Sequence, residues 1–139
     1  MMRVGKTERL DTIMQNLSVE IGRPFKSCVV TNERGLIIAG TTKNGSYSDR
    51  LAAMISLLSD TSRRVNENLG YDHPRITTIK GSGVSIAVHE FRVQDKWFRI
   101  GTELDDGRFL FFRRVEDKRV WQSLEKTADQ VRSVLEDKL

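Results

Sequence analysis

Residues 28–39 read CVVTNERGLIIA, two short apolar runs joined by a polar stretch at residues 32–35. Two such runs around a polar turn that contains glycine predict a β-hairpin. Both runs are almost continuously apolar and lack the alternation of a strand with one side in water. The sequence therefore predicts a hairpin within a sheet that is covered on both faces.

A first helix is predicted ahead of the hairpin. Thr7 is a suitable N-cap, and Gly22 followed by Pro24 ends the helix. The apolar residues between these limits recur at helical spacing and form one stripe. They are Leu10, Ile13, Met14, Leu17 and Ile21.

A second helix is predicted after the hairpin, with Ser46 or Ser48 as its cap, and it runs to about Leu69 before Gly70. Apolar or small residues occupy most of the circumference of this helix. One face of a sheet can cover only part of that surface. A partner helix is the natural complement of such a helix. Its apolar stripe consists of Leu51, Ile55, Leu58, Val65 and Leu69, widened by Met54, Leu57 and Thr61.

The rest of the chain predicts more strands and a last helix. Strands are expected at residues 75–80, 84–93, 97–104 and 108–115, with turns between them. Residues 117–139 form a long amphipathic helix. Its apolar positions are Trp121, Leu124, Ala128, Val131, Leu135 and Leu139.

These elements predict the fold class. The order is helix, two strands, helix, three or four strands, helix, and the hairpins make the sheet largely antiparallel. We expect one α+β layered domain over residues 1–139, with about five or six strands and helices on both faces of the sheet.

Composition sets the broad class of the protein. The chain has 139 residues, of which 38% are apolar, and it has ten glycines. A chain of this length and composition can bury a hydrophobic core without disulfides. Cys28 is the single cysteine, which fits a reducing compartment. No apolar run approaches the length of about 18 residues that crosses a bilayer. We therefore expect a cytoplasmic protein without membrane insertion.

The charge does not favour nucleic acid as the main partner. The net charge is +4, but residues 1–70 hold ten basic and seven acidic groups, and residues 71–139 hold thirteen and twelve. Neither half is a basic tail, and phosphate contacts need a clustered patch. Nucleic-acid binding stays an alternative, as does a sensory module of profilin-like fold with a small ligand between sheet and helix.

The residues that carry chemistry in other proteins have structural explanations here. Cys28 lies in an apolar strand, His89 alternates with apolar residues on a strand face, and His73 before a proline is expected to be a solvated turn residue. Residues 81–83 lack the lysine of a phosphate-binding loop, and the acidic pair at 105–106 is a turn signal. We expect no catalytic residue, no metal and no cofactor.

Two segments resemble the roadblock family, which includes dynein light chain relatives and bacterial polarity regulators. Residues 28–39 are similar to the family's strand, glycine-containing turn and second strand. Residues 48–58 are similar to its Ala-rich second helix, at the expected distance. The resemblance covers residues 8–104 and departs from the family in the possible strand at 108–115 and the long last helix.

The resemblance implies a non-enzymatic homodimer that binds a small Ras-like GTPase and regulates or scaffolds it. Family members pair their second helices over a continuous sheet. The expected dimer residues are Leu51, Met54, Ile55, Leu58 and Val65. The expected partner-binding residues lie on the second helix and adjoining loop: Asn44, Tyr47, Arg50, Arg63, Arg64 and Asn68.

Overall fold

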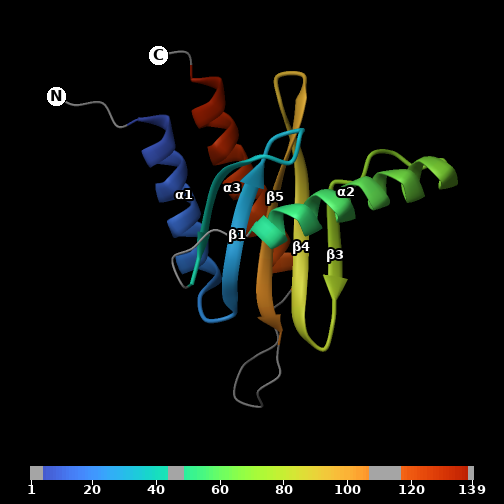
Figure 1. The fold of residues 1–139 in the computed structure, drawn as a ribbon, viewed down its shortest axis with the longest axis horizontal. Helices are drawn as coiled ribbons and strands as arrows, with labels where there is room; N and C mark the ends of the chain where they lie inside the picture. Colours follow the sequence, from blue (N-terminus) through green and yellow to red (C-terminus); the bar gives the residue numbers. More distant parts are fainter. Residues whose placement is uncertain (1–4, 44–48, 107–116, 138–139) are drawn as a thin grey trace.

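Three helices and five strands make up the part of the chain that the structure describes (Figure 1). The structure is a computed structural model that describes residues 5–43, 49–106 and 117–137. The elements are α1 (Lys6–Ile21), β1 (Phe25–Thr31), β2 (Ile37–Thr42), α2 (Asp49–Leu69), β3 (Ile76–Lys80), β4 (Gly83–Val93), β5 (Lys96–Asp106) and α3 (Asp117–Glu136). This order confirms the α+β prediction, while the strand expected at residues 108–115 lies outside the described residues. None of the described helices is long and apolar enough to cross a bilayer.

The predicted hairpin is present as the antiparallel pair β1 and β2. Its turn is held by Asn32, whose side-chain oxygen accepts hydrogen bonds from the backbone N–H groups of Arg34 (2.9 Å) and Leu36 (3.0 Å). Gly35 has a φ of 82°, a conformation that costs glycine little. The polar turn residues therefore direct the two apolar strands back along each other.

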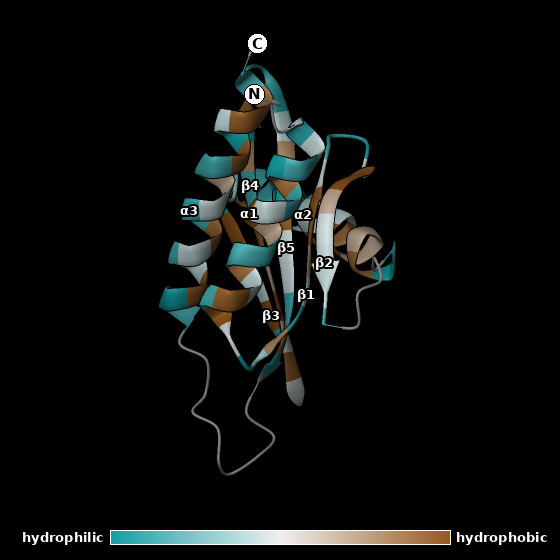
Figure 2. Ribbon diagram, turned by 90° about the vertical axis from the view of Figure 1, so that its left-hand side faces the viewer, coloured by the Kyte–Doolittle hydropathy of each residue, from teal (hydrophilic) through white to brown (hydrophobic). Residues whose placement is uncertain are grey.

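The five strands form one sheet in the order β2-β1-β5-β4-β3, and every neighbouring pair is antiparallel. Helices α1 and α3 pack side by side on one face of the sheet, and α2 crosses the other face (Figures 1 and 2). The sheet is therefore covered on both faces, as the two apolar runs of the hairpin predicted.

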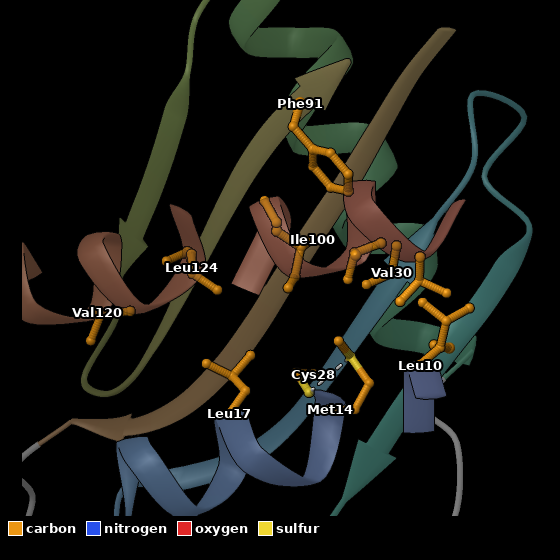
Figure 3. Close-up of a cluster of buried hydrophobic side chains, with 14 of the residues drawn as sticks. Leu10, Met14, Leu17, Cys28, Val30, Phe91, Ile100, Val120 and Leu124 are labelled. Atoms are coloured by element: carbon orange, nitrogen blue, oxygen red, sulfur yellow. Dashed lines mark hydrogen bonds between the residues drawn. The ribbon is translucent and has the colours of Figure 1, made fainter. Parts of the chain in front are cut away.

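The main core lies between the sheet and the helix pair α1 and α3. Figure 3 shows its centre, where the Sγ of Cys28 points at the Sδ of Met14, 3.7 Å away. A smaller core lies between the sheet and α2, and its buried residues are Val29, Leu51, Ala52, Ile55 and Val88. Adjacent residues of β1 thus enter different cores, because successive side chains of a strand point to opposite faces.

Helix α3 confirms most of its predicted stripe, in which Leu135 is partly buried against the main core. Leu124, Ala128 and Val131 are buried in the main core. Trp121 is only half-buried, and its indole N–H donates a hydrogen bond to the hydroxyl of Thr78 at 2.9 Å. The buried face also includes Val120 and Val134, so it is rotated from the predicted stripe towards them. Leu139 lies outside the described residues.

Two local predictions are wrong. Thr7 does not cap α1, because the helix already begins at Lys6 with Gly5 as the N-cap, and no side chain bonds to this end. The acidic pair Asp105 and Asp106 does not form a turn. These residues continue β5, where they lie opposite Val84 and Gly83 of β4. Ladder hydrogen bonds to a neighbour of equal length outweigh the local turn preference of aspartate. Ser46 and Ser48 lie outside the described residues.

Candidate interaction surface on the second helix

Helix α2 is longer than the sheet beneath it is wide. Its 21 residues span about 31 Å at about 1.5 Å per residue. It contacts β1, β5, β4 and β3, which at about 4.8 Å between strands span about 15 Å. The C-terminal end of α2 consequently extends beyond the edge strand β3 (Figure 1).

The apolar stripe of α2 is divided between the sheet and the surface. Leu51 and Ile55 are buried against the sheet, and Leu58 is half-buried. The remaining large apolar side chains are exposed by 40% to 63% of their surface: Met54 (40%), Leu57 (58%), Val65 (49%) and Leu69 (63%). Of the five expected dimer residues, two therefore stabilise the fold, and Met54 and Val65 remain available to another molecule.

A groove of about 420 Å³ runs between α2 and the edge strand β3. Leu58 and Val65 line its helix side, and Ile76, Thr77 and Ile79 line its strand side. Ile79 is itself an exposed hydrophobic residue. The groove thus borders the uncovered flank of α2, which carries the exposed Met54 and Val65. On its other side lies an edge strand whose outer backbone groups have no neighbour in the described sheet.

The expected partner-binding residues do not form one cluster. Arg50 lines a small pocket with Met54, on the flank of α2 that carries the apolar groove. Arg64 and Asn68 are exposed further along the helix. Arg63 pairs with Asp60, with 3.5 Å between Nη2 and Oδ1. Asn44 and Tyr47 lie outside the described residues.

A buried ion-pair network, which sequence reasoning missed, lies where α2 crosses the sheet. Arg99 of β5 donates from Nε to Glu90 of β4 at 3.1 Å and from Nη2 to Asp60 of α2 at 3.0 Å. Arg99 and Glu90 are both buried. A signal was present in the sequence, because the turn at residues 94–95 sets a register that places Glu90 directly opposite Arg99.

His73 belongs to this network, so its prediction as a solvated turn residue is wrong. Its Nε2 pairs with the second carboxylate oxygen of Glu90. Its ring also stacks on Trp97, with 4.0 Å between the ring centroids. The loop before Pro74 brings His73 over the sheet because β3 must return from the far end of α2. That path depends on tertiary packing, and no local pattern in the sequence predicts it.

The other potentially reactive side chains, Cys28 and His89, are buried within the fold. Burial raises the pKa of the Cys28 thiol to about 12, so the thiol is protonated at neutral pH and is a poor nucleophile. His89 is buried, and its Nδ1 donates a hydrogen bond to the carbonyl oxygen of Arg75 at 3.0 Å. Within the described residues, no group of three or more His, Cys, Asp or Glu side chains is arranged to hold a metal ion.

We expect His89 to make the protein less stable in acid. Burial lowers the pKa of His89 from 6.5, so the folded protein keeps it neutral. As the pH falls below about 6.5, the unfolded chain binds a proton at this position that the folded protein does not bind, and stability decreases. Urea unfolding at pH 7 and pH 5 should show a smaller decrease for His89→Gln than for the unchanged protein. An equal decrease in both would contradict this assignment.

Comparison with known proteins bears on the fold. No family model matches the sequence, and no curated protein matches it. Solved structures do match. Myxococcus xanthus MglB is 12% identical, with a TM-score of 0.73, and the match covers 98% of this chain and 94% of that one. An MglB structure described as having a tetrameric arrangement is 13% identical, with a TM-score of 0.76 and coverage of 100% and 96%.

A Roadblock/LC7 domain from Streptomyces avermitilis is 16% identical, with a TM-score of 0.73 and coverage of 91% and 98%. At such low identity these likenesses concern the fold alone. They extend over nearly the whole chain and confirm the fold that the hairpin and second helix implied.

Proposed function

From the roadblock-like fold of this chain, we propose that it is a non-enzymatic homodimer that binds a small Ras-like GTPase and regulates or scaffolds it. The observation that carries the proposal is the uncovered apolar flank of α2 beside the groove along β3. Exposed apolar residues that continue into a groove are typical of an interaction site. The neighbouring edge strand offers unpaired backbone groups to the same partner.

A second copy of the chain is the occupant that best suits this flank. A twofold interface uses the same patch on both molecules, so a flank with exposed Met54 and Val65 would meet its own equivalent. Two helices that extend beyond their own sheets can each lie along the groove of the other molecule. The half-buried Leu58 would then be covered completely.

The GTPase as further partner comes from the family resemblance, and the surface of α2 is compatible with it. Arg64 and Asn68 are exposed on this helix and remain free to contact another protein. Arginine is enriched at protein interfaces. No catalytic group is needed for regulation, because a protein that prefers one nucleotide state of a switch shifts the switch towards that state.

Titration against the Ras-like GTPases of the host, loaded with GDP or with a non-hydrolysable GTP analogue, tests this function. We expect binding with about a tenfold preference for one state, which corresponds to about 1.4 kcal/mol. Arg64→Glu should weaken binding about tenfold by removing an interface charge. Arg119→Glu, an exposed arginine on α3 at the opposite face, is the matched control.

The same titration separates the function from the fold. This protein alone should hydrolyse neither GTP nor ATP. If it is a dimer but binds no GTPase in either state, the proposed partner is wrong. Equal weakening by Arg64→Glu and Arg119→Glu would place the contact away from α2.

A small-ligand module remains the second candidate because the groove along β3 has the volume of a small-molecule site, about 420 Å³. In a dimer the partner helix would occupy this space. A small molecule that raises the unfolding temperature of the protein and competes with its self-association would favour the ligand over the second copy.

A further inference from the structure

We propose that Arg99 is a positioning residue that sets how α2 lies on the sheet, by holding Asp60 of the helix and Glu90 of β4 at the same time. The inference rests on the proposed function in one respect: it makes the geometry of the α2 flank, and hence self-association, depend on a side chain that lies beneath the helix.

The guanidinium of Arg99 joins two elements through separate nitrogen atoms. Nε donates to Glu90 at 3.1 Å, and Nη2 donates to Asp60 at 3.0 Å. The Arg99 and Glu90 side chains are exposed by 9% and 6%, whereas that of Asp60 is exposed by 45%. The sheet-side pair is thus buried, and its contact to the helix is at the margin of the interface. Arginine suits this role because its planar group presents donors in fixed directions.

The remaining contacts between α2 and the sheet change character along the helix. Around Leu51 and Ile55 they are apolar, and apolar contacts have no preferred direction. One turn later the buried hydroxyl of Ser59 has no hydrogen-bond partner, and neither does that of Thr31, which lies opposite Arg99 on β1. The hydrogen bond from Arg99 to Asp60 is therefore a directional link between β5 and the helix where the two cross.

The position of the link determines what it controls. Asp60 lies beside the part of α2 that lines the groove along β3, and the exposed Val65 and Leu69 follow it. A small rotation of the helix at Asp60 would change the direction in which these two side chains point. Beyond Asp60 the helix is also tied to the edge strand, because the hydroxyl of Thr77 donates a hydrogen bond to that of Ser62 at 2.8 Å, whereas Arg99 ties it to the central strand β5. Arg99 thereby aligns the apolar flank with the groove along β3.

Asp60→Ala tests the link, with Asp129→Ala as the matched control. Each aspartate forms a pair with an arginine three residues later on its own helix, Asp60 with Arg63 and Asp129 with Arg132. Each substitution also introduces a good helix former. The two variants therefore differ in that only Asp60→Ala removes a contact to Arg99. We expect amide hydrogen exchange at residues 61–69 to be about tenfold faster in Asp60→Ala than in Asp129→Ala, and self-association to be about tenfold weaker.

The exchange measurement stands apart from the proposed dimer. If the unchanged protein is monomeric, the dimer is wrong, but faster exchange at residues 61–69 in Asp60→Ala would still support the positioning role. Equal exchange in the two variants would overturn it. Asp60→Glu keeps the carboxylate and should restore part of the protection. Arg99→Lys, which cannot present the same two donors in a plane, should repeat the effect of Asp60→Ala.

Discussion

Replacing Met54 with glutamate is expected to convert the proposed dimer into a monomer. Met54 is 40% exposed on α2, one helical turn before Leu58 of the groove along β3, and a twofold interface would bury it twice. An unpaired carboxylate buried at an interface costs about 3 kcal/mol, so the two copies together raise the dissociation constant about ten-thousandfold. Light scattering should then report the chain mass of 15.9 kDa in place of twice that mass.

Val19→Glu is the control for this experiment. Val19 is 79% exposed on α1, which covers the other face of the sheet, so the same substitution there should leave the dimer intact. A monomeric unchanged protein at tens of micromolar would remove the dimer from the proposal. If Val19→Glu dissociated the dimer and Met54→Glu did not, the interface would lie on the α1 side.

Replacing Gly101 with alanine is expected to destabilise the fold strongly. A methyl group at Gly101 of β5 would lie 2.4 Å from Cγ2 of Ile55, the fully buried residue at the centre of the α2 contact. The Cβ of Ile55 is itself only 3.3 Å from the added methyl group, so rotating the side chain does not relieve the crowding, and α2 would have to lift from the sheet. Overpacking of this kind costs about 3 kcal/mol, which lowers the unfolding temperature of a domain this size by about 10 °C.

A double-mutant cycle tests the cause of this loss. Ile55→Ala removes the clashing atom, so the double variant should be less destabilised than the sum of the two single variants. Gly81→Ala is the control, because its methyl group would meet its nearest neighbour at an ordinary 3.5 Å. Additive effects at Gly101 and Ile55 would show that the close approach of helix and sheet is not what requires glycine.

The candidate surface was only partly predictable because it depends on what the sheet leaves uncovered. The sequence predicted the apolar stripe of α2 and a partner helix that would cover it. It did not distinguish Ile55, which the sheet buries completely, from Val65, which remains exposed. That difference follows from the width of the sheet, and so from the order of the strands, which sequence periodicity does not contain.

The amino-acid sequence alone determined the elements of this protein and the layers that they form. Apolar runs, helical spacing and turn residues are local patterns, so they predicted the hairpin, the three helices and a sheet covered on both faces. Tertiary structure alone decided which residues meet across those layers. Arg99 reaches Asp60, 39 positions earlier, and His73 stacks on Trp97 because folding brings distant segments together. These contacts depend on how the helix crosses the strands, which is set by the packing of the whole core.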